Sequence, residues 1–473
     1  MRKTKIVCTI GPACENEATI KEMILAGMNV ARLNFSHNTV EDHLRRLNMI
    51  KKMREELQIP VAILLDTKGP EYRVGLFKND KATIKEGNEF IFTTDDVMGD
   101  EHIASVNYKS LHNDLNVGDV ILVNNGLLEF KVTKIEGNNI YTTIVTGGDI
   151  SNRKSMSFPN KVLKQIYLSE QDKKDIKFGL EHDVDYIACS FVSQKQDLVD
   201  VKNYIESLGY DTIKDVTLIA KIENRAGIDN IEEICEVCDG IMIGRGDMGV
   251  EIPFDQLPAI QKELITKCRL IGKRVITATE MLESMINNPR PTRAEISDVA
   301  NAVYDGSSAV MLSGETAAGK YPVKTIKTMS KICVTTENSI DYATKYQNNE
   351  FQINNTMDAI SHSVCQMAID INAKAIVVCS ISGTTARMVS RFRPPVDIIG
   401  MSVNEKTWRT LSLSWGIVPM ICDVHPVMED LFITAKQLAK EKLNLQPGDK
   451  IIITGSNTMG KVGSTNNIRI ETI

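Results

Sequence analysis

The sequence predicts an α/β fold: a (β/α)8 TIM barrel with an inserted small β-barrel lid domain and a C-terminal open α/β domain. Eight apolar runs of strand length alternate with helical segments over roughly 250 residues, which is the usual size of such a barrel. About a hundred residues of short β-like runs with turn pairs interrupt this alternation from Lys68-Gly69-Pro70 onward. A second strand–helix alternation follows a polar stretch, Tyr342–Asn355, which is predicted to be a linker.

The barrel strands are predicted from apolar runs, and the helices from apolar residues at helical spacing. Leu168-Ser169-Glu170 adds a capping signal where the alternation resumes after the interruption. The predicted strands are Lys5–Gly11, Val30–Ser36, Val61–Thr67, Asp185–Phe191, Thr217–Ile222, Gly240–Gly244, Arg274–Thr279 and Ser308–Leu312. The predicted helices are Glu17–Met28, Val40–Leu57, Asp172–Leu180, Gln194–Leu208, Gly227–Val237, Gln256–Leu270 and Thr292–Val303.

Four segments follow from this pattern. Residues 1–68 and 168–342 are the two parts of the barrel domain, residues 69–167 are the inserted lid, and residues 343–473 are the C-terminal α/β domain. The lid strands are predicted at Phe90–Thr94, Val120–Asn124, Leu127–Ile135 and Asn139–Val145. Those of the C-terminal sheet are predicted at Ala375–Ile381, Asp397–Val403, Ile417–Cys422, Lys450–Gly455 and Ile468–Ile473.

The composition is that of an ordinary soluble globular protein, with 42% hydrophobic and 25% charged residues in a chain of 473. The formal net charge of −6 argues against nucleic acid as the main partner, because there is no basic excess to neutralise a phosphate backbone. No apolar run reaches the roughly 18 residues of a membrane span. The ten cysteines form no zinc set, and the first apolar stretch is too short for a signal peptide. We therefore expect a cytoplasmic protein that does not bind membranes.

The stretch from Leu218 to Pro253 carries the strongest chemical signal. Lys221 and Glu223 are two residues apart, so in a strand they share one face, and Asp247 follows the next strand. One ammonium and two carboxylates then meet above neighbouring parallel strands, which suits Mg²⁺ with a phosphorylated ligand. A solvated ion pair and an ordinary Arg-Gly-Asp turn explain this stretch alone equally well.

Polar residues also follow the other strands of the predicted barrel. Asn34, Ser36, Asp66 and Thr67, at the second and third strands, offer hard oxygen ligands without a His or Cys, which favours a hard monovalent or divalent cation over zinc. Alternation places Thr277 and Thr279 on one face of the seventh strand. The remaining residues of this set are Arg32, Asn34, Ser36, Asp66, Thr67, Ser313 and Glu315.

At these residues the chain resembles the pyruvate kinase family, over essentially its whole length. The matching stretches are CTIGPA (8–13), MNVARLNFSH (28–37), LLDTKGPEYR (64–73), AKIEN (220–224), RGDMGVEIP (245–253), MLESM (281–285), PRPTRAEISDVANAVYDG (289–306) and MLSGETAAGKYP (311–322). The resemblance implies a phosphotransferase that moves the phosphoryl group of phosphoenolpyruvate to ADP, giving pyruvate and ATP, in the last step of glycolysis.

The resemblance also implies roles for individual residues. Glu223 and Asp247 would hold Mg²⁺ (or Mn²⁺), Lys221 would stabilise the phosphoryl group in flight, and Arg32 would touch the phosphate. Gly246, Asp247 and Thr279 would hold the substrate carboxylate, and Thr279 or Ser313 would connect the enolate to a proton source through water. Three further groups of residues are implied: for K⁺, Asn34, Ser36, Asp66 and Thr67; for the nucleotide, Asn34, His37, Arg73 and Lys154; for a sugar-phosphate or AMP effector in a homotetramer, Ser382, Gly383, Thr384 and Thr385.

The chain departs from the common family pattern at several positions. The lid has Asn124-Asn125-Gly126 where Asp-Asp-Gly is common, and Ser155-Met156-Ser157-Phe158-Pro159 where Gly-Val-Asn-X-Pro is usual. Gly244 replaces a common Ala and Glu280 a common Gln. None of these changes removes a proposed ligand, but they affect the expected nucleotide contacts and closure of the lid.

Two other functions remain alternatives. One is a Schiff-base aldolase on the same barrel with Lys221 as nucleophile, although two adjacent carboxylates oppose the lowered pKa that such a lysine needs. The other is a catalytically weak regulatory or moonlighting binder, against which the intact set Lys221, Glu223, Asp247 and Thr279 argues.

Overall fold

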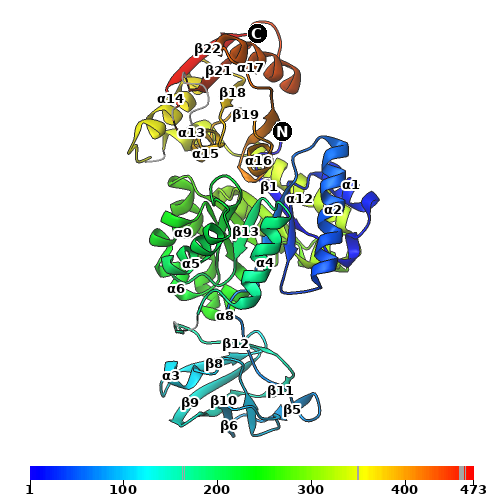
Figure 1. The fold of residues 1–473 in the computed structure, drawn as a ribbon, viewed down its shortest axis with the longest axis vertical. Helices are drawn as coiled ribbons and strands as arrows, with labels where there is room; N and C mark the ends of the chain where they lie inside the picture. The colour runs from blue at the N-terminus through cyan, green and yellow to red at the C-terminus, as the bar shows by residue number, and fades with distance from the viewer. Residues whose placement is uncertain (162, 165, 349–350, 457–462, 464) are drawn as a thin grey trace.

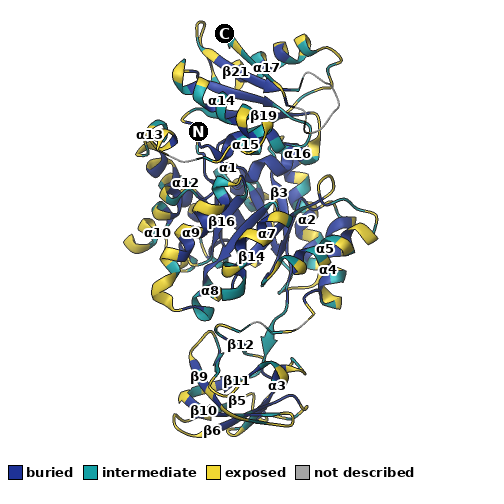
Figure 2. Ribbon diagram, turned by 90° about the vertical axis from the view of Figure 1, so that its left-hand side faces the viewer, coloured by how far each residue is buried: buried dark blue, intermediate teal, exposed yellow. Residues whose placement is uncertain are grey.

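The structure is a computed structural model that describes residues 1–161, 163–164, 166–348, 351–456, 463 and 465–473. Its central unit is a closed barrel of eight parallel strands in the order β1-β17-β16-β15-β14-β13-β3-β2, as predicted. These strands are β1 (Lys5–Thr9), β2 (Val30–Asn34), β3 (Ala62–Asp66), β13 (Tyr186–Cys189), β14 (Thr217–Ile222), β15 (Gly240–Gly244), β16 (Arg274–Ala278) and β17 (Ala309–Leu312). Almost every residue of these strands is buried, as the dark strands of the barrel in Figure 2 show.

Helices surround the barrel and begin where the sequence provides caps. Thr292 caps α10 with Glu295 in a capping box, and Ser169 Oγ accepts from the Asp172 N–H at the start of α4, 3.0 Å away. These helices are α1 (Glu17–Ala26), α2 (Val40–Leu57), α4 (Glu170–Glu181), α5 (Lys195–Ser207), α6 (Arg225–Asp229), α7 (Ile231–Val237), α8 (Arg245–Glu251), α9 (Leu257–Leu270), α10 (Arg293–Asp305), α11 (Gly314–Ala317) and α12 (Pro322–Asn338).

Two helical predictions need correction. The helix expected at Gly227–Val237 is two helices, α6 and α7, because the chain leaves helical geometry at Asn230, whose backbone angles are φ −97° and ψ 16°. A plain turn was one of the two predictions for Arg245-Gly246-Asp247. These residues instead form the first turn of the short helix α8.

The insert after β3 forms a seven-stranded sheet in the order β4-β12-β8-β9-β10-β6-β7 and a two-stranded sheet of β11 and β5. Its own hydrophobic core includes the packed rings of Phe90, Phe92 and Phe130. Its elements are β4 (Tyr72–Arg73), β5 (Lys81–Ile84), β6 (Glu89–Thr93), β7 (Ile103–Ser105), α3 (Leu111–Asp114), β8 (Val120–Val123), β9 (Leu128–Glu136), β10 (Asn139–Thr146), β11 (Gly148–Ser151) and β12 (Ser155–Ser157). The insert lies at one end of the barrel and the C-terminal domain at the other (Figure 1).

The C-terminal domain is an open five-stranded sheet in the order β20-β19-β18-β21-β22, of which only β22 is antiparallel. Part of the expected linker is helical, since α13 (Tyr342–Gln347) lies within it, whereas residues 349–350 of that stretch lie outside the described residues. The other elements are α14 (Thr356–Asp370), β18 (Ala375–Cys379), α15 (Thr384–Arg391), β19 (Asp397–Ser402), α16 (Glu405–Thr410), β20 (Ile417–Ile421), α17 (Met428–Leu443), β21 (Lys450–Gly455) and β22 (Asn467–Thr472).

The C-terminal domain closes the floor of the barrel, the end at which the strands begin. Leu413 packs into the apolar interior of the barrel together with Tyr186, whose hydroxyl donates to the Thr410 carbonyl. Arg409 pairs with the buried Asp185 at 2.8 Å. This leaves the opposite end of the barrel, where the strands end, facing the insert. Among the described helices, none has the length and apolarity needed to cross a lipid bilayer.

Candidate active site

Charged side chains from three strands meet at the carboxyl end of the barrel. Arg32 is a buried residue in the middle of β2, and its Nε lies 2.6 Å from Asp66 Oδ2 at the tip of β3. Lys221 Nζ on β14 lies 3.0 Å from Asp66 Oδ1 and 3.0 Å from Glu223 Oε1. Asp66 and Glu223 are almost fully buried, so these ion pairs are poorly screened by solvent.

The ammonium of Lys221 is held from several sides. Besides its two carboxylate contacts, Nζ donates to Ser190 Oγ at 2.7 Å, and Ser190 Oγ in turn donates to the Thr67 carbonyl at 2.7 Å. Burial alone would lower the pKa of Lys221, but Asp66 and Glu223 outweigh it and raise the pKa above its ordinary value. Lys221 is therefore a fixed positive charge at this rim.

The carboxyl group of Glu223 carries a charge that the protein only partly compensates. Its Oε2 accepts from the Phe191 N–H at 2.8 Å, yet burial raises its pKa to about 7, with Lys221 opposing the shift and Asp247 adding to it. Gly244 makes room for this carboxyl group, because a Cβ at that position would lie 2.6 Å from Glu223 Oε1. Gly244, which stands where the family commonly has Ala, therefore affects where the Glu223 carboxyl group can lie.

Asp247 lies beside Glu223 at the exposed edge of the rim, in the first turn of α8. Loss of hydration raises its pKa, Lys221 lowers it, and the nearby Glu71 raises it further. The pKa values of both carboxyl groups are raised because the protein places too little positive charge beside them. A divalent cation with oxygen preference would supply that charge, so the donor set fits Mg²⁺.

Thr279 does not lie where strand alternation placed it. β16 ends at Ala278, and Thr279 and the following Glu280 have φ values of 68° and 54°, a left-handed backbone that non-glycine residues seldom adopt. Thr277 instead faces Ser307, with their hydroxyl oxygens 2.7 Å apart. The shared face predicted for Thr277 and Thr279 is therefore wrong, because the backbone turns between them.

The turn at Thr279 brings its hydroxyl to the rim in another way. The Gly246 N–H donates to Thr279 Oγ1 at 2.9 Å, which links the end of β16 to the start of α8. Arg245 fixes the strained turn: its guanidinium donates to the Thr279 carbonyl and pairs with Asp298 at 2.8 Å. Neither Arg245 nor Ser190 is among the predicted site residues, although the position of Ser190 at the end of a barrel strand is a signal for it.

The four residues of the predicted K⁺ set end two neighbouring strands. Asn34 and Asp66 are directly paired in the register of β2 and β3, and Ser36 and Thr67 follow them in the chain. Asn34 Oδ1 accepts from the Ser36 N–H at 3.2 Å. Asp66 also pairs with Arg32 and Lys221, so its carboxylate is shared between this set and the residues predicted to contact the phosphoryl group.

The predicted nucleotide residues are more dispersed. His37 is exposed after β2, whereas Arg73 and Lys154 belong to the base of the insert. Arg73 Nε donates to Glu71 Oε2 at 2.9 Å and its Nη1 to the Arg153 carbonyl at 2.7 Å. Within the described residues no hydrogen bond or ion pair joins His37 to either of these cations.

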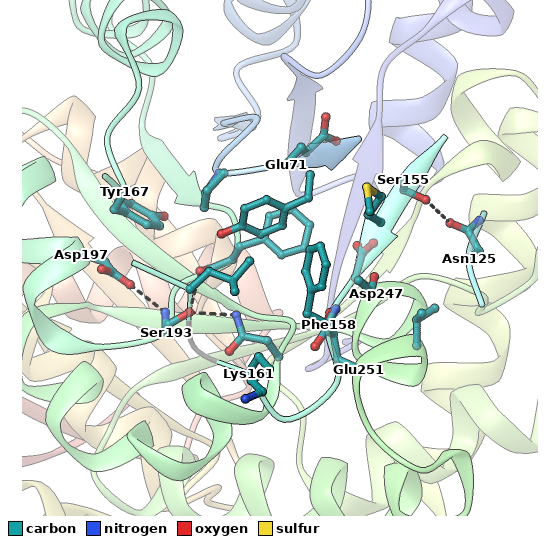
Figure 3. Close-up of a pocket in the computed structure, with 18 of the residues that line it drawn as sticks. Glu71, Asn125, Ser155, Phe158, Lys161, Tyr167, Ser193, Asp197, Asp247 and Glu251 are labelled. Carbon is teal, nitrogen blue, oxygen red and sulfur yellow. Dashed lines mark hydrogen bonds between the residues drawn. The ribbon is translucent and has the colours of Figure 1, made fainter. Parts of the chain in front are cut away.

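A cavity of about 130 Å³ lies between the insert and the rim of the barrel. Figure 3 shows Glu71, Phe158, Asp247 and Glu251 around it. Glu251, at the end of α8, accepts from the Phe158 N–H of the insert at 3.3 Å, and burial raises its pKa to about 7. Glu251 thus ties the insert to the same short helix that carries Asp247.

The unusual sequence of the insert is compatible with its local structure. Asn124, Asn125 and Gly126 have φ values of 56°, 56° and 79°, and Asn and Gly adopt this left-handed conformation more readily than other residues. Ser155 Oγ donates to Asn125 Oδ1 at 3.1 Å, so the two departing stretches contact each other.

The predicted effector loop lies in the C-terminal domain. Gly383 has a φ of 74° at the start of α15, and its N–H donates to Ser380 Oγ at 3.1 Å. The Ser382 and Thr384 hydroxyl oxygens are 3.1 Å apart, and Thr385 Oγ1 lies 2.6 Å from Thr465 Oγ1. The hydroxyl groups of Ser382 and Thr384 therefore lie together, whereas that of the buried Thr385 faces Thr465.

Known proteins resemble this chain over its whole length. Two family models match: "Pyruvate kinase, barrel domain" at residues 1–326 and "Pyruvate kinase, alpha/beta domain" at residues 358–471. A pyruvate kinase of Staphylococcus epidermidis is 44% identical over 476 residues, covering 100% of this chain and 81% of the relative. A pyruvate kinase of Clostridium perfringens is 42% identical over 479 residues, with 100% of both chains covered.

A solved structure gives the same result. The crystal structure of a pyruvate kinase from Cryptosporidium parvum matches with a TM-score of 0.94 at 36% identity, covering 100% of this chain and 96% of that one. Family models, full-length relatives and fold agree, so this chain belongs to the pyruvate kinase family of phosphotransferases.

Proposed function

We propose that the chain transfers the phosphoryl group of phosphoenolpyruvate to ADP, giving pyruvate and ATP, with Mg²⁺ (or Mn²⁺) and K⁺ as cofactors. One observation carries this proposal: a buried ammonium, Lys221, is fixed between Asp66 and Glu223 at the rim that faces the insert. Pyruvate formation from phosphoenolpyruvate and ADP, measured with and without each cation, tests the proposal. A protein that is inactive under all these conditions would contradict it.

Glu223 and Asp247 would hold the divalent cation, which supplies charge neutralisation for the transferring phosphoryl group. Lys221 and Arg32 lie next to this pair and would bind the phosphate oxygens. Phosphoryl transfer depends on positioning and electrostatic stabilisation, so preorganised cations are the main contribution the protein has to make.

Thr279 would hold the substrate carboxylate, together with the N–H groups at the start of α8. After transfer an enolate remains and takes up a proton, and Thr279 or Ser313 would relay that proton through water. Ser313 Oγ is buried and has no hydrogen-bond partner among the described residues, which fits a group that waits for substrate or water. The insert would close as a lid over the nucleotide and exclude water.

The Schiff-base alternative is disfavoured by the charge state of Lys221. An amine acts as a nucleophile only when it loses its proton, and such lysines have a lowered pKa. Asp66 and Glu223 raise the pKa of Lys221 instead. Borohydride added with substrate is therefore expected to trap no adduct on Lys221.

Potassium dependence gives a prediction at Glu71. This carboxylate lies 2.9 Å from Arg73 and close enough to Asp247 to raise the pKa of the latter. In the pyruvate kinase family, enzymes with Glu at this position depend on K⁺, whereas enzymes with Lys there do not. We expect wild-type activity to rise strongly with K⁺, and Glu71→Lys to lessen the requirement because its ammonium replaces the monovalent charge.

The K⁺ prediction is checked by steady-state rates against K⁺ concentration, with a large organic cation keeping the ionic strength constant. Glu71→Gln is the matched control, since it removes the carboxylate without adding an ammonium and is expected to keep the requirement. Equal wild-type rates with and without K⁺ would refute the site.

Regulation gives a prediction at the loop 382–385. The paired hydroxyl groups of Ser382 and Thr384 and the N–H groups of the first turn of α15 suit a phosphate, although an ordinary helix cap uses the same groups. We propose that a sugar phosphate or AMP binds there and shifts a homotetramer towards higher substrate affinity. Sigmoidal dependence on phosphoenolpyruvate, relieved by such a metabolite, is the expected behaviour.

Replacing Ser382, Thr384 and Thr385 together with Ala should abolish that relief and leave kcat at saturating substrate nearly unchanged. Titrations with fructose 1,6-bisphosphate, ribose 5-phosphate, glucose 6-phosphate and AMP would identify the effector, and light scattering would give the assembly state. If none of the four metabolites activates the wild type, the loop is an ordinary helix cap. If the triple variant loses kcat, the loop has a structural role instead.

A further inference from the structure

A small cavity is lined by residues at the floor of the barrel and on α15 of the C-terminal domain. Figure 1 shows α15 at the end of the barrel opposite the insert, away from the candidate active site. The volume of the cavity is about 10 Å³, which is room for one water-sized occupant. Among the described residues no acidic side chain lines it. The basic residues that line it are Arg269, Lys273, Arg274, Arg387, Arg391 and Arg393.

Two of these basic residues are neutralised by the protein itself. Arg387 Nη1 lies 2.6 Å from Asp239 Oδ1, and Arg391 Nη2 lies 3.2 Å from Asp358 Oδ1. Both arginines therefore have a carboxylate partner and need no further anion.

Arg274 and Arg393 differ in this respect, because among the described residues both donate only to neutral oxygens. Arg274 Nε donates to Ser414 Oγ at 3.0 Å, and Arg393 Nη2 donates to the Gly306 carbonyl at 2.8 Å. The side chains are nearly inaccessible, with 6% of Arg274 and 7% of Arg393 exposed. Arg393 Nε is buried and has no hydrogen-bond partner in the part of the chain that the structure describes.

A buried guanidinium without an anion is costly, because it loses its hydration and cannot escape the cost by deprotonation at ordinary pH. Burial lowers the pKa of Arg274 and of Arg393, and the charges of Asp239 and Glu337, respectively, only partly oppose the shift. The ring of Trp415 lies 4.5 Å from the Arg393 guanidinium and relieves part of the cost, but it brings no net charge. A water molecule in the cavity would be neutral as well.

We propose that this cavity binds a monatomic anion, chloride in ordinary buffers, which neutralises Arg274 and Arg393. The donors around it are of the right kind: guanidinium N–H groups, together with the hydroxyl groups of Ser390 and Ser414 that also line the cavity. The small volume excludes phosphate and sulfate. Because Arg274 begins β16 and Arg393 follows α15, the anion joins the barrel floor to the C-terminal domain. The site is independent of the proposed catalytic function.

Bromide identifies such an anion directly, because its anomalous scattering distinguishes it from water. Crystals of the full chain grown with potassium bromide in place of chloride should show an anomalous peak in the cavity, within contact of both guanidinium groups. The melting temperature should also be higher, by at least about 2 °C, in potassium chloride than in potassium gluconate at equal ionic strength.

Two variants complete the test. Arg393→Met removes one of the two guanidinium groups proposed to hold the anion, and it should abolish both the bromide peak and the difference between chloride and gluconate. Arg46→Met is the matched control, since Arg46 is also a fully buried arginine but pairs with the carboxylate of Glu15. This control is expected to lose stability and keep the chloride effect.

The wild-type crystal decides the question even if Arg393→Met fails to fold. A cavity that holds only water at saturating bromide, with equal melting temperatures in chloride and gluconate, would overturn the proposal. If sulfate binds in the cavity, the inference from the cavity volume that only a monatomic anion fits would be wrong.

Discussion

Replacing Lys221 with Met is expected to lower kcat by at least roughly 10³-fold, with a modest change in the KM for phosphoenolpyruvate. The ammonium is fixed 3.0 Å from both Asp66 and Glu223, so it is already in place when the phosphoryl group carries its transition-state charge. A group that acts mainly in the transition state affects kcat more than binding. The loss corresponds to about 4 kcal/mol of transition-state stabilisation.

Steady-state rates over a range of phosphoenolpyruvate concentrations check this expectation. Lys5→Met is a matched control on another strand of the same barrel. Lys5 is also buried, but its Nζ donates to the Ile417 carbonyl at 2.6 Å, at the floor. The control should lose stability without a comparable loss of kcat. A Lys221→Met enzyme that retains more than about a tenth of the wild-type kcat would exclude the proposed role.

Much of this rim could be predicted because it follows from local periodicity. The strand period of two puts Lys221, in β14, on the same side as Glu223, which directly follows that strand. The parallel neighbour β15 brings Asp247 to the same edge. Eight apolar runs with helices between them are enough to predict a closed barrel, and such barrels carry their sites where the strands end. The predicted fold and the predicted family are both confirmed.

Other parts depend on contacts that no local pattern encodes. Thr279 leaves the strand because Arg245, far away in the sequence, binds its carbonyl. Asp66 was expected in a potassium site, but its contacts with Arg32 and Lys221 depend on how β2, β3 and β14 are placed around the barrel. Each of these contacts joins residues that are well separated in the chain, and only the closed barrel brings them together.

The closure of the barrel floor is a further example. Leu413 is an apolar residue at the end of a short 3-10 helix, Leu411–Leu413, and nothing in its neighbourhood indicates that it enters the interior of another domain. The same is true of Arg274 and Arg393, which are distant in sequence and line one cavity. The sequence shows two α/β blocks but not the surface along which they meet.

The second large effect is expected at the carboxylate pair. Glu223→Gln and Asp247→Asn should each lower kcat by roughly 10³-fold or more, since a bound divalent cation supplies several kcal/mol of charge stabilisation. Each substitution removes one negative charge while the amide keeps the shape of the side chain. Burial and Asp247 raise the pKa of Glu223 to about 7, so the pair is short of positive charge. Weaker cation binding is the direct consequence.

Binding of Mn²⁺, followed by electron paramagnetic resonance without substrates, separates this effect from a general loss of activity. Both variants should bind Mn²⁺ at least roughly tenfold more weakly than the wild type, which is the scale of altered metal-site residues. Glu315→Gln is the matched control, because Glu315 is also buried after a barrel strand but accepts from the Leu282 and Ser313 N–H groups. It should lose stability and keep the wild-type affinity for Mn²⁺. If Glu223→Gln and Asp247→Asn bind Mn²⁺ as tightly as the wild type, the cation lies elsewhere and the raised pKa of Glu223 reflects burial alone.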